Sequence, residues 1–148
     1  LEDLNVNYYK VASVTAKKRP DLVEKILLKN KPTIISLGMY EDNIFPYGFD
    51  NNITYLYCVS KYPTMLDDLR VKNMPMFNDQ GYQGYSDHTL GISAAIKSYF
   101  NGASLIEKHY TFNRNAQKNC ELAHLCSFTP ETLRQFSNLI KEFKVMEK

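Results

Sequence analysis

The chain is poor in net charge and has no long apolar run, and each of these absences excludes a class of protein. Its 18 basic and 16 acidic side chains leave a net charge of only +2, too small to predict binding to nucleic acid or to a membrane surface. No apolar run approaches the roughly 18 residues that cross a bilayer. Because 44% of the residues are hydrophobic and 23% are charged, residues 1–148 are expected to form a single globular domain with no nucleic-acid or membrane partner.

The sequence also lacks the marks of a secreted protein. Its first ten residues, LEDLNVNYYK, contain no basic segment followed by an apolar one, so no secretory signal is visible, and the missing initiator Met indicates an excerpt of a longer protein. Cys58, Cys120 and Cys126 are an odd number of thiols, which indicates a reducing, cytoplasmic location. Cys120, His124 and Cys126 are close in sequence, but a zinc site there would lack a fourth ligand, and we favour a loop with two incidental thiols.

Short β-rich runs recur along the chain. Most have the near-continuous apolar character of strands that are buried on both faces of a parallel sheet. These runs lie near residues 8–13, 32–38, 53–60, 83–87 and 103–110.

Helical patterns separate most of these runs. Residues 19–29 have an apolar face that includes Leu22, and residues 89–102 have apolar residues at helical spacing with Gly102 as the stop. A last helix begins after Thr129, a suitable N-cap. Strands that alternate with helices predict an α/β fold with a parallel sheet.

Five βα units leave two architectures open. They do not close an eight-stranded barrel, which needs about 250 residues. The sheet is therefore either an open, doubly wound sheet or a TIM barrel with three units missing. In both folds function gathers at the C-terminal ends of the strands.

Polar side chains follow every predicted strand at this functional end. Because the C-terminal ends of parallel strands meet at one edge of a sheet, these side chains predict a shared site. They are Lys10 and Ser13; Ser36; Ser60, Lys61 and Tyr62; Ser86, Asp87 and His88; and Glu107, Lys108 and His109.

The residue types at this edge suit two kinds of chemistry. His88 and His109 follow adjacent strands, where two imidazoles can share one divalent metal whose remaining ligands are water and substrate oxygens. Such an open shell suits Lewis-acid chemistry on a carbonyl. Glu107 is placed to handle protons or to hold a ligand. A second group of side chains suits the binding of a phosphate or carboxylate. It consists of one positive charge, on Lys10, and the hydroxyls of Ser13, Ser60 and Ser86.

Two of these segments resemble a known family. GYSDHTLG (84–91) followed by GASLIEKHYT (102–111) is similar to the paired signature of the sialic acid synthases. That family includes N-acetylneuraminate, legionaminic and pseudaminic acid synthases and related spore-coat polysaccharide enzymes. YKVAS (9–13), KPTIISLGM (31–39) and CVSKYP (58–63) match its preceding strands in order. The resemblance implies strands four to eight of a TIM barrel, without the first three βα units and without the family's antifreeze-like domain.

The resemblance also implies an activity. The family condenses phosphoenolpyruvate with an N-acetylated hexose such as N-acetylmannosamine, giving a nonulosonic (sialic-type) acid and phosphate. His88 and His109 would then be catalytic ligands of a divalent metal, Mn²⁺ or Mg²⁺, with Glu107 a catalytic residue of the same pocket. Tyr62 would contact the sugar. The residues that would bind phosphoenolpyruvate are Lys10, Ser13, Ser60 and Ser86.

Three positions depart from the family pattern. Thr15 stands where many members carry Glu, Leu37 replaces a Thr, and Ala123 takes the place of an Asp that contacts the sugar. The alternatives are another phosphoenolpyruvate-condensing enzyme, such as a keto-deoxy sugar phosphate synthase, or an inactive remnant or half-barrel that needs a partner chain. That partner would be a second copy or the missing part of the barrel.

Overall fold

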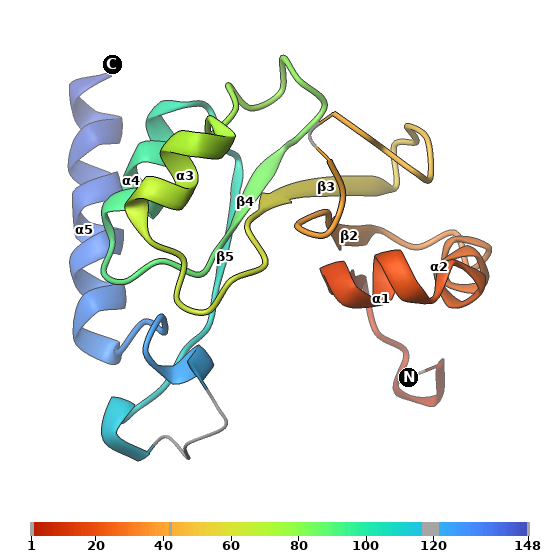
Figure 1. Ribbon diagram of the computed structural model, residues 1–148, viewed down its shortest axis with the longest axis horizontal. Coiled ribbons are helices and arrows are strands. Elements are labelled where there is room, and N and C mark those ends of the chain that lie inside the picture. Colours follow the sequence, from red (N-terminus) through yellow and green to blue (C-terminus); the bar gives the residue numbers. More distant parts are fainter. Residues whose placement is uncertain (1, 42, 117–121, 148) are drawn as a thin grey trace.

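One parallel sheet of five strands organises the structure. The computed structural model describes residues 2–41, 43–116 and 122–147. Each strand pairs in parallel with the strand that follows it in the chain. Figure 1 shows the strands, which are β1 (Tyr9–Val11), β2 (Thr33–Ser36), β3 (Ile53–Cys58), β4 (Gly84–Asp87) and β5 (Leu105–Lys108).

The strand order decides between the two predicted architectures. A doubly wound sheet reverses its strand order at a switch point, whereas barrel strands follow one another in chain order. The order here is β1-β2-β3-β4-β5 without reversal. The prediction of five βα units from a TIM barrel is therefore confirmed, and the open doubly wound sheet is excluded.

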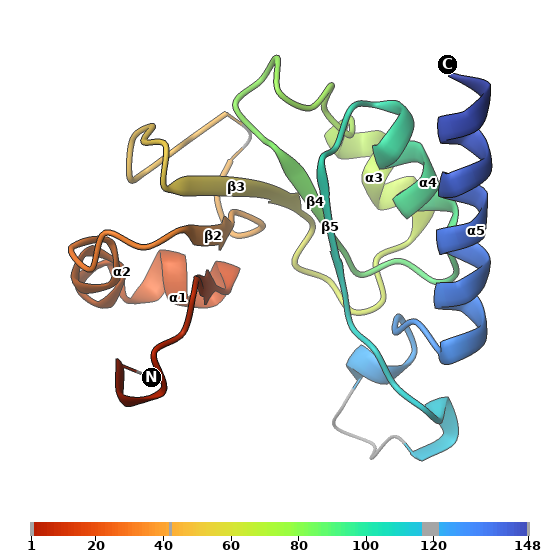
Figure 2. The ribbon, with the colours of Figure 1, turned by 180° about the vertical axis from the view of Figure 1, so that it is seen from behind.

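Helices lie at both ends of the sheet. In Figures 1 and 2, α3, α4 and α5 gather beside β4 and β5, while α1 and α2 lie near the N-terminus. Short 3₁₀ turns occupy Glu2–Leu4, Arg114–Ala116 and Leu122–His124. The helices are α1 (Ser13–Lys18), α2 (Pro20–Leu27), α3 (Leu66–Lys72), α4 (Ser93–Phe100) and α5 (Pro130–Met146).

Helix boundaries follow capping chemistry where the sequence provides it. Thr129 accepts a hydrogen bond from the Thr132 backbone N–H, as an N-cap does. Helix α4 ends at Phe100, and Gly102 follows with a φ of 91° that suits glycine. In α2 the fully buried residue is Val23, whereas Leu22 stays 38% exposed. No helix in the described part of the chain is long and apolar enough to cross a membrane.

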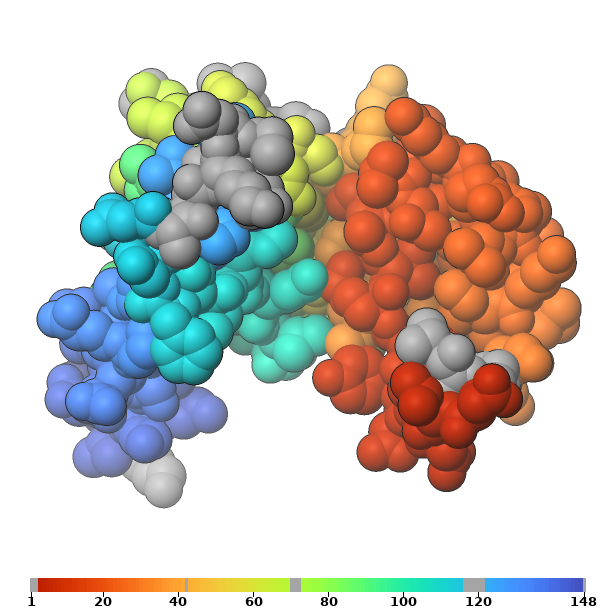
Figure 3. Space-filling model, turned by 90° about the horizontal axis from the view of Figure 1, so that it is seen from below, coloured from red at the N-terminus to blue at the C-terminus, as the bar shows by residue number. Residues whose placement is uncertain are grey.

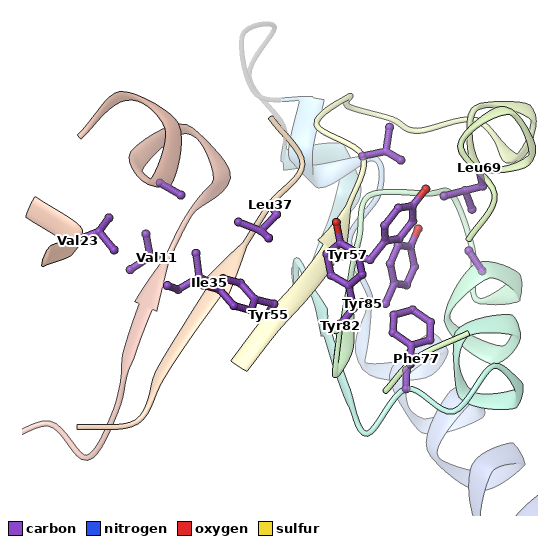
Figure 4. Close-up of a cluster of buried hydrophobic side chains, with 14 residues drawn as sticks. Val11, Val23, Ile35, Leu37, Tyr55, Tyr57, Leu69, Phe77, Tyr82 and Tyr85 are labelled. Carbon is purple, nitrogen blue, oxygen red and sulfur yellow. The ribbon is translucent and has the colours of Figure 1, made fainter. Parts of the chain in front are cut away.

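The apolar core residues of the strands share one face of the sheet, and the polar residues of the candidate site share the other. Successive residues of a strand point to opposite sides, and the residues on the helix-covered side form a buried core that includes Val23 of α2 and Ala94 of α4. Figure 4 shows the strand residues of this core, which are Val11, Ile35, Tyr55, Tyr57 and Tyr85. The opposite face carries Lys10, Ser36, Cys58, Ser86 and Glu107.

The polar face lines the open side of the half-barrel. Seen from below, the N-terminal and C-terminal parts of the chain form two sides with a groove between them (Figure 3). On this face the side chains of Lys10 and Glu107 are partly exposed, whereas Ser36, Cys58 and Ser86 are buried.

Candidate active site

The first polar cluster joins the two outermost strands. Lys10 Nζ on β1 donates to Ser36 Oγ at 2.9 Å and lies 3.2 Å from Glu107 Oε2 on β5. The side chains of Lys10 and Glu107 are 30% and 42% exposed. An ion pair this open to water contributes little stability. The Lys10 ammonium also donates to the Val11 carbonyl oxygen at 2.9 Å, so its three donors have partners in Val11, Ser36 and Glu107.

Hydroxyls and a thiol surround the next part of the polar face. Ser13 Oγ, in the first turn of α1, accepts a hydrogen bond from the Gly38 backbone N–H at 3.0 Å. The Cys58 thiol interacts with the hydroxyls of Ser13 and Ser86, yet burial dominates and raises the pKa of this thiol. A Cβ on Gly38 would lie 2.5 Å from Ser60 Oγ, so glycine is needed for this close approach.

The second cluster is aromatic and contains the two predicted metal ligands. The ring centroids of His88 and His109 are 5.4 Å apart, and the Tyr62 ring lies 4.1 Å from the first and 5.7 Å from the second. Burial lowers the pKa of His88, and desolvation also lowers the pKa of His109. Both rings are therefore held in the neutral form that metals require.

A backbone contact fixes the tautomer of His88. Its Nδ1 lies 3.0 Å from the Val59 carbonyl oxygen, which only accepts hydrogen bonds, so Nδ1 carries the proton and Nε2 keeps its lone pair. Metal-ligating histidines commonly use this kind of carbonyl contact. Among the described residues no group of three or more His, Cys, Asp or Glu is arranged to hold a metal. His88 and His109 bring two imidazoles together, and their role as metal ligands stays a prediction.

A pocket of about 630 Å³ opens beside the histidines. Of the described residues that line it, none is acidic and none is Lys or Arg. Ala123 is among them, at the position where the family pattern carries an acidic residue. The lining residues are Tyr62, His109, Tyr110, Leu122, Ala123, His124 and Ser127.

The structure brings most of the predicted site residues together in these two clusters. Lys61 instead pairs with Asp68 at 2.9 Å, and Asp87 and Lys108 pair with each other on the sheet face of Tyr85. Two further residues, which the sequence reasoning did not assign to the site, join the two clusters: Cys58 and His124. Strand alternation was the available signal for Cys58, which shares the sheet face of Lys10, Ser36 and Ser86. The zinc site that the sequence disfavours includes Cys120, which lies outside the described residues, so the preferred loop with two incidental thiols stays a prediction. The Cys126 thiol contacts the Ala123 carbonyl oxygen at 3.2 Å.

The fold and the polar face define half of a (β/α)₈ barrel with a site at the C-terminal ends of its strands. All 148 residues match the model of the NeuB family. An uncharacterized protein of Methanocaldococcus jannaschii is 32% identical over an alignment that covers 100% of this chain and 44% of the relative. The chain belongs to the NeuB family.

Relatives with assigned activities and a solved structure agree with membership of the NeuB family. Pseudaminic acid synthase of Helicobacter pylori is 38% identical over 79% of this chain and 37% of its own length. N-acetylneuraminate-9-phosphate synthase of Homo sapiens is 27% identical over 100% and 42%. The N-acetylneuraminic acid synthetase of Leptospira borgpetersenii, solved with citrate, superposes with a TM-score of 0.74 at 23% identity and shares the fold. The chain covers 53% of that structure and less than half of these curated relatives.

Proposed function

We propose that residues 1–148 are the C-terminal part of the catalytic barrel of a cytoplasmic nonulosonic acid synthase. The reaction joins phosphoenolpyruvate to the open-chain aldehyde of an N-acetylated hexose and releases phosphate. The observation that carries the proposal is the placement of two clusters on one sheet face. One is the partly exposed Lys10 beside Glu107, and the other is a neutral histidine pair beside a pocket. The free thiols Cys58 and Cys126 support a reducing compartment.

The Lys10 cluster supplies the phosphoenolpyruvate end of the site. The Lys10 ammonium neutralises an anionic group of the substrate, and the hydroxyls of Ser13, Ser60 and Ser86 donate hydrogen bonds to its oxygens. Glu107 lies beside this charge and accepts a proton from the water that adds to the cationic carbon after carbon–carbon bond formation. Loss of phosphate by carbon–oxygen cleavage then gives the keto group of the product.

The histidine cluster supplies the sugar end. A divalent ion such as Mn²⁺ or Mg²⁺, held by His88 and His109, would polarise the sugar aldehyde as a Lewis acid. Tyr62 packs against both imidazoles at the wall of the pocket and contacts the sugar.

Binding of phosphoenolpyruvate tests the proposal. Titration of phosphoenolpyruvate into the chain with Mn²⁺ present, followed by calorimetry, is expected to show saturable binding. Lys10→Met removes a charge-assisted contact worth ~1.5–3 kcal/mol and is expected to weaken binding at least about tenfold. Lys97→Met, on the exposed side of α4, is the matched control. Equal binding by both variants would contradict the proposed role of Lys10, and an inactive remnant would show no binding at all.

A further inference from the structure

A buried ion pair lies directly behind the histidine pair. Lys108 Nζ on β5 is 2.7 Å from Asp87 Oδ2 on β4, and the two side chains are 1% and 0% exposed. Asp87 and Lys108 are also register partners in the sheet. Each immediately precedes one of the two histidines, so the pair links the backbones from which His88 and His109 emerge.

The polar groups of the pair are well supplied with partners. Asp87 Oδ1 accepts hydrogen bonds from the Thr89 backbone N–H at 2.8 Å, from Thr89 Oγ1 at 2.7 Å and from the Tyr85 hydroxyl at 3.2 Å. Lys108 Nζ also donates to the Thr89 carbonyl oxygen at 2.7 Å and lies 5.4 Å above the Phe128 ring. His88 is therefore bracketed by two residues, Asp87 and Thr89, that are both tied to Lys108.

Stability alone gives a weak reason for such a pair. The desolvation of two charges offsets much of their attraction, and well-packed apolar residues often stabilise a core equally well. What the ion pair adds is a fixed geometry between two strand ends. The backbone on either side is held as well, because Thr64 N–H donates to the His88 carbonyl at 2.8 Å and Phe128 N–H donates to the His109 carbonyl at 2.7 Å.

We infer that Asp87 and Lys108 are positioning residues that set the spacing and orientation of His88 and His109 for a shared divalent ion. This inference rests on the proposed function, since it assigns a role to residues behind the proposed metal site. The two positioning residues do not touch the ion. They act through the backbone of β4 and β5, in the way that outer-shell partners orient metal ligands.

A double substitution separates positioning from folding. Asp87→Asn keeps the acceptor for Thr89 and Tyr85, and Lys108→Met keeps most of the side-chain volume. Each single variant leaves an unpaired buried group and is expected to unfold at lower urea concentration, whereas the double variant is expected to recover much of that loss. Mn²⁺ affinity, measured by water-proton relaxation on the full chain, is nevertheless expected to stay roughly 10- to 100-fold weaker in the double variant. A double variant that binds Mn²⁺ as tightly as the unmodified chain overturns the inference.

Two further variants keep the outcomes distinct. If the double variant does not fold, Thr89→Val removes one hydroxyl donor to Asp87 with little change of shape; weaker Mn²⁺ binding supports positioning, and unchanged binding overturns it. His88→Ala tests the proposed metal site itself. If the unmodified chain binds Mn²⁺ no better than His88→Ala does, the result contradicts both the proposed metal site and the inference. If binding depends on His88 but not on the ion pair, only the inference falls.

Discussion

Lys10 on the first strand of the sheet and Glu107 on the last strand meet across its concave face, with Nζ 3.2 Å from Oε2. In a flat sheet, side chains on two outermost strands with three strands between them lie far apart, since neighbouring strands are about 4.8 Å from each other. The contact therefore shows that the sheet of the half-barrel is curved. It also places an acid and a base where the polar side chains of β1, β2 and β5 converge.

This contact makes a prediction about substrate affinity. Glu107→Gln removes a negative charge that competes with phosphoenolpyruvate for Lys10. A like charge at about 4 Å costs ~1 kcal/mol in water, so the variant is expected to bind phosphoenolpyruvate about fivefold more tightly in calorimetry. Weaker binding would indicate that Glu107 orients Lys10 rather than competing for it.

A second prediction concerns the close approach at Gly38. A Cβ there would lie 2.5 Å from Ser60 Oγ and 2.9 Å from Cys58 Sγ. Gly38→Ala is expected to lower the free energy of unfolding by ~1–3 kcal/mol, as overpacking does, in urea unfolding followed by circular dichroism. The double variant Gly38→Ala/Ser60→Ala removes the nearer clash and is expected to regain part of the loss. No regain would place the strain at Cys58 instead.

The sequence predicted the five strands well because their apolar runs are buried on both faces of a parallel sheet. It missed α1, since Ser13 continues a β-rich run in sequence but begins a helix in the structure. It also missed Cys58 as a site residue, because the place of this thiol on the polar face follows from the alternation of side chains within β3 and not from a polar residue type at a strand end. The Lys10–Glu107 contact depends on sheet curvature, which no local pattern encodes. Burial of Lys108 likewise depends on a residue distant in sequence, since its ammonium lies 5.4 Å from the centroid of the Phe128 ring.

A third prediction concerns alkaline pH. Burial raises the pKa of Tyr55 to about 12, above the value of about 10 for an unfolded tyrosine. Between pH 10 and 12 the unfolded chain loses this proton while the folded chain keeps it, so stability falls as pH rises through that window. Tyr55→Phe is expected to lose less stability between pH 9 and 11 in urea unfolding than the unmodified chain does.

Tyr55→Phe is also expected to lower the free energy of unfolding at neutral pH, and this difference serves as a control. The Tyr55 hydroxyl donates to the Gly48 carbonyl oxygen at 2.8 Å, and loss of such a bond costs ~1 kcal/mol. Tyr55→Phe should therefore be less stable at pH 7 and converge with the unmodified chain at high pH. Parallel stability curves for the two proteins would contradict the predicted ionisation of Tyr55.

The last prediction is that the 148-residue chain by itself lacks synthase activity. The outer strands β1 and β5 each pair on one side only among the described strands, and unpaired edges favour association with another chain. Catalysis depends on groups held in place before the reaction starts, and a misplacement of about 1 Å can cost roughly 10²-fold in rate. The site residues come here from five strands, whereas a closed barrel of this kind has eight. Phosphate release from phosphoenolpyruvate, N-acetylmannosamine and Mn²⁺ is the measurement, with an intact family member as the reference. Turnover within tenfold of that reference would show that five βα units suffice to orient both substrates.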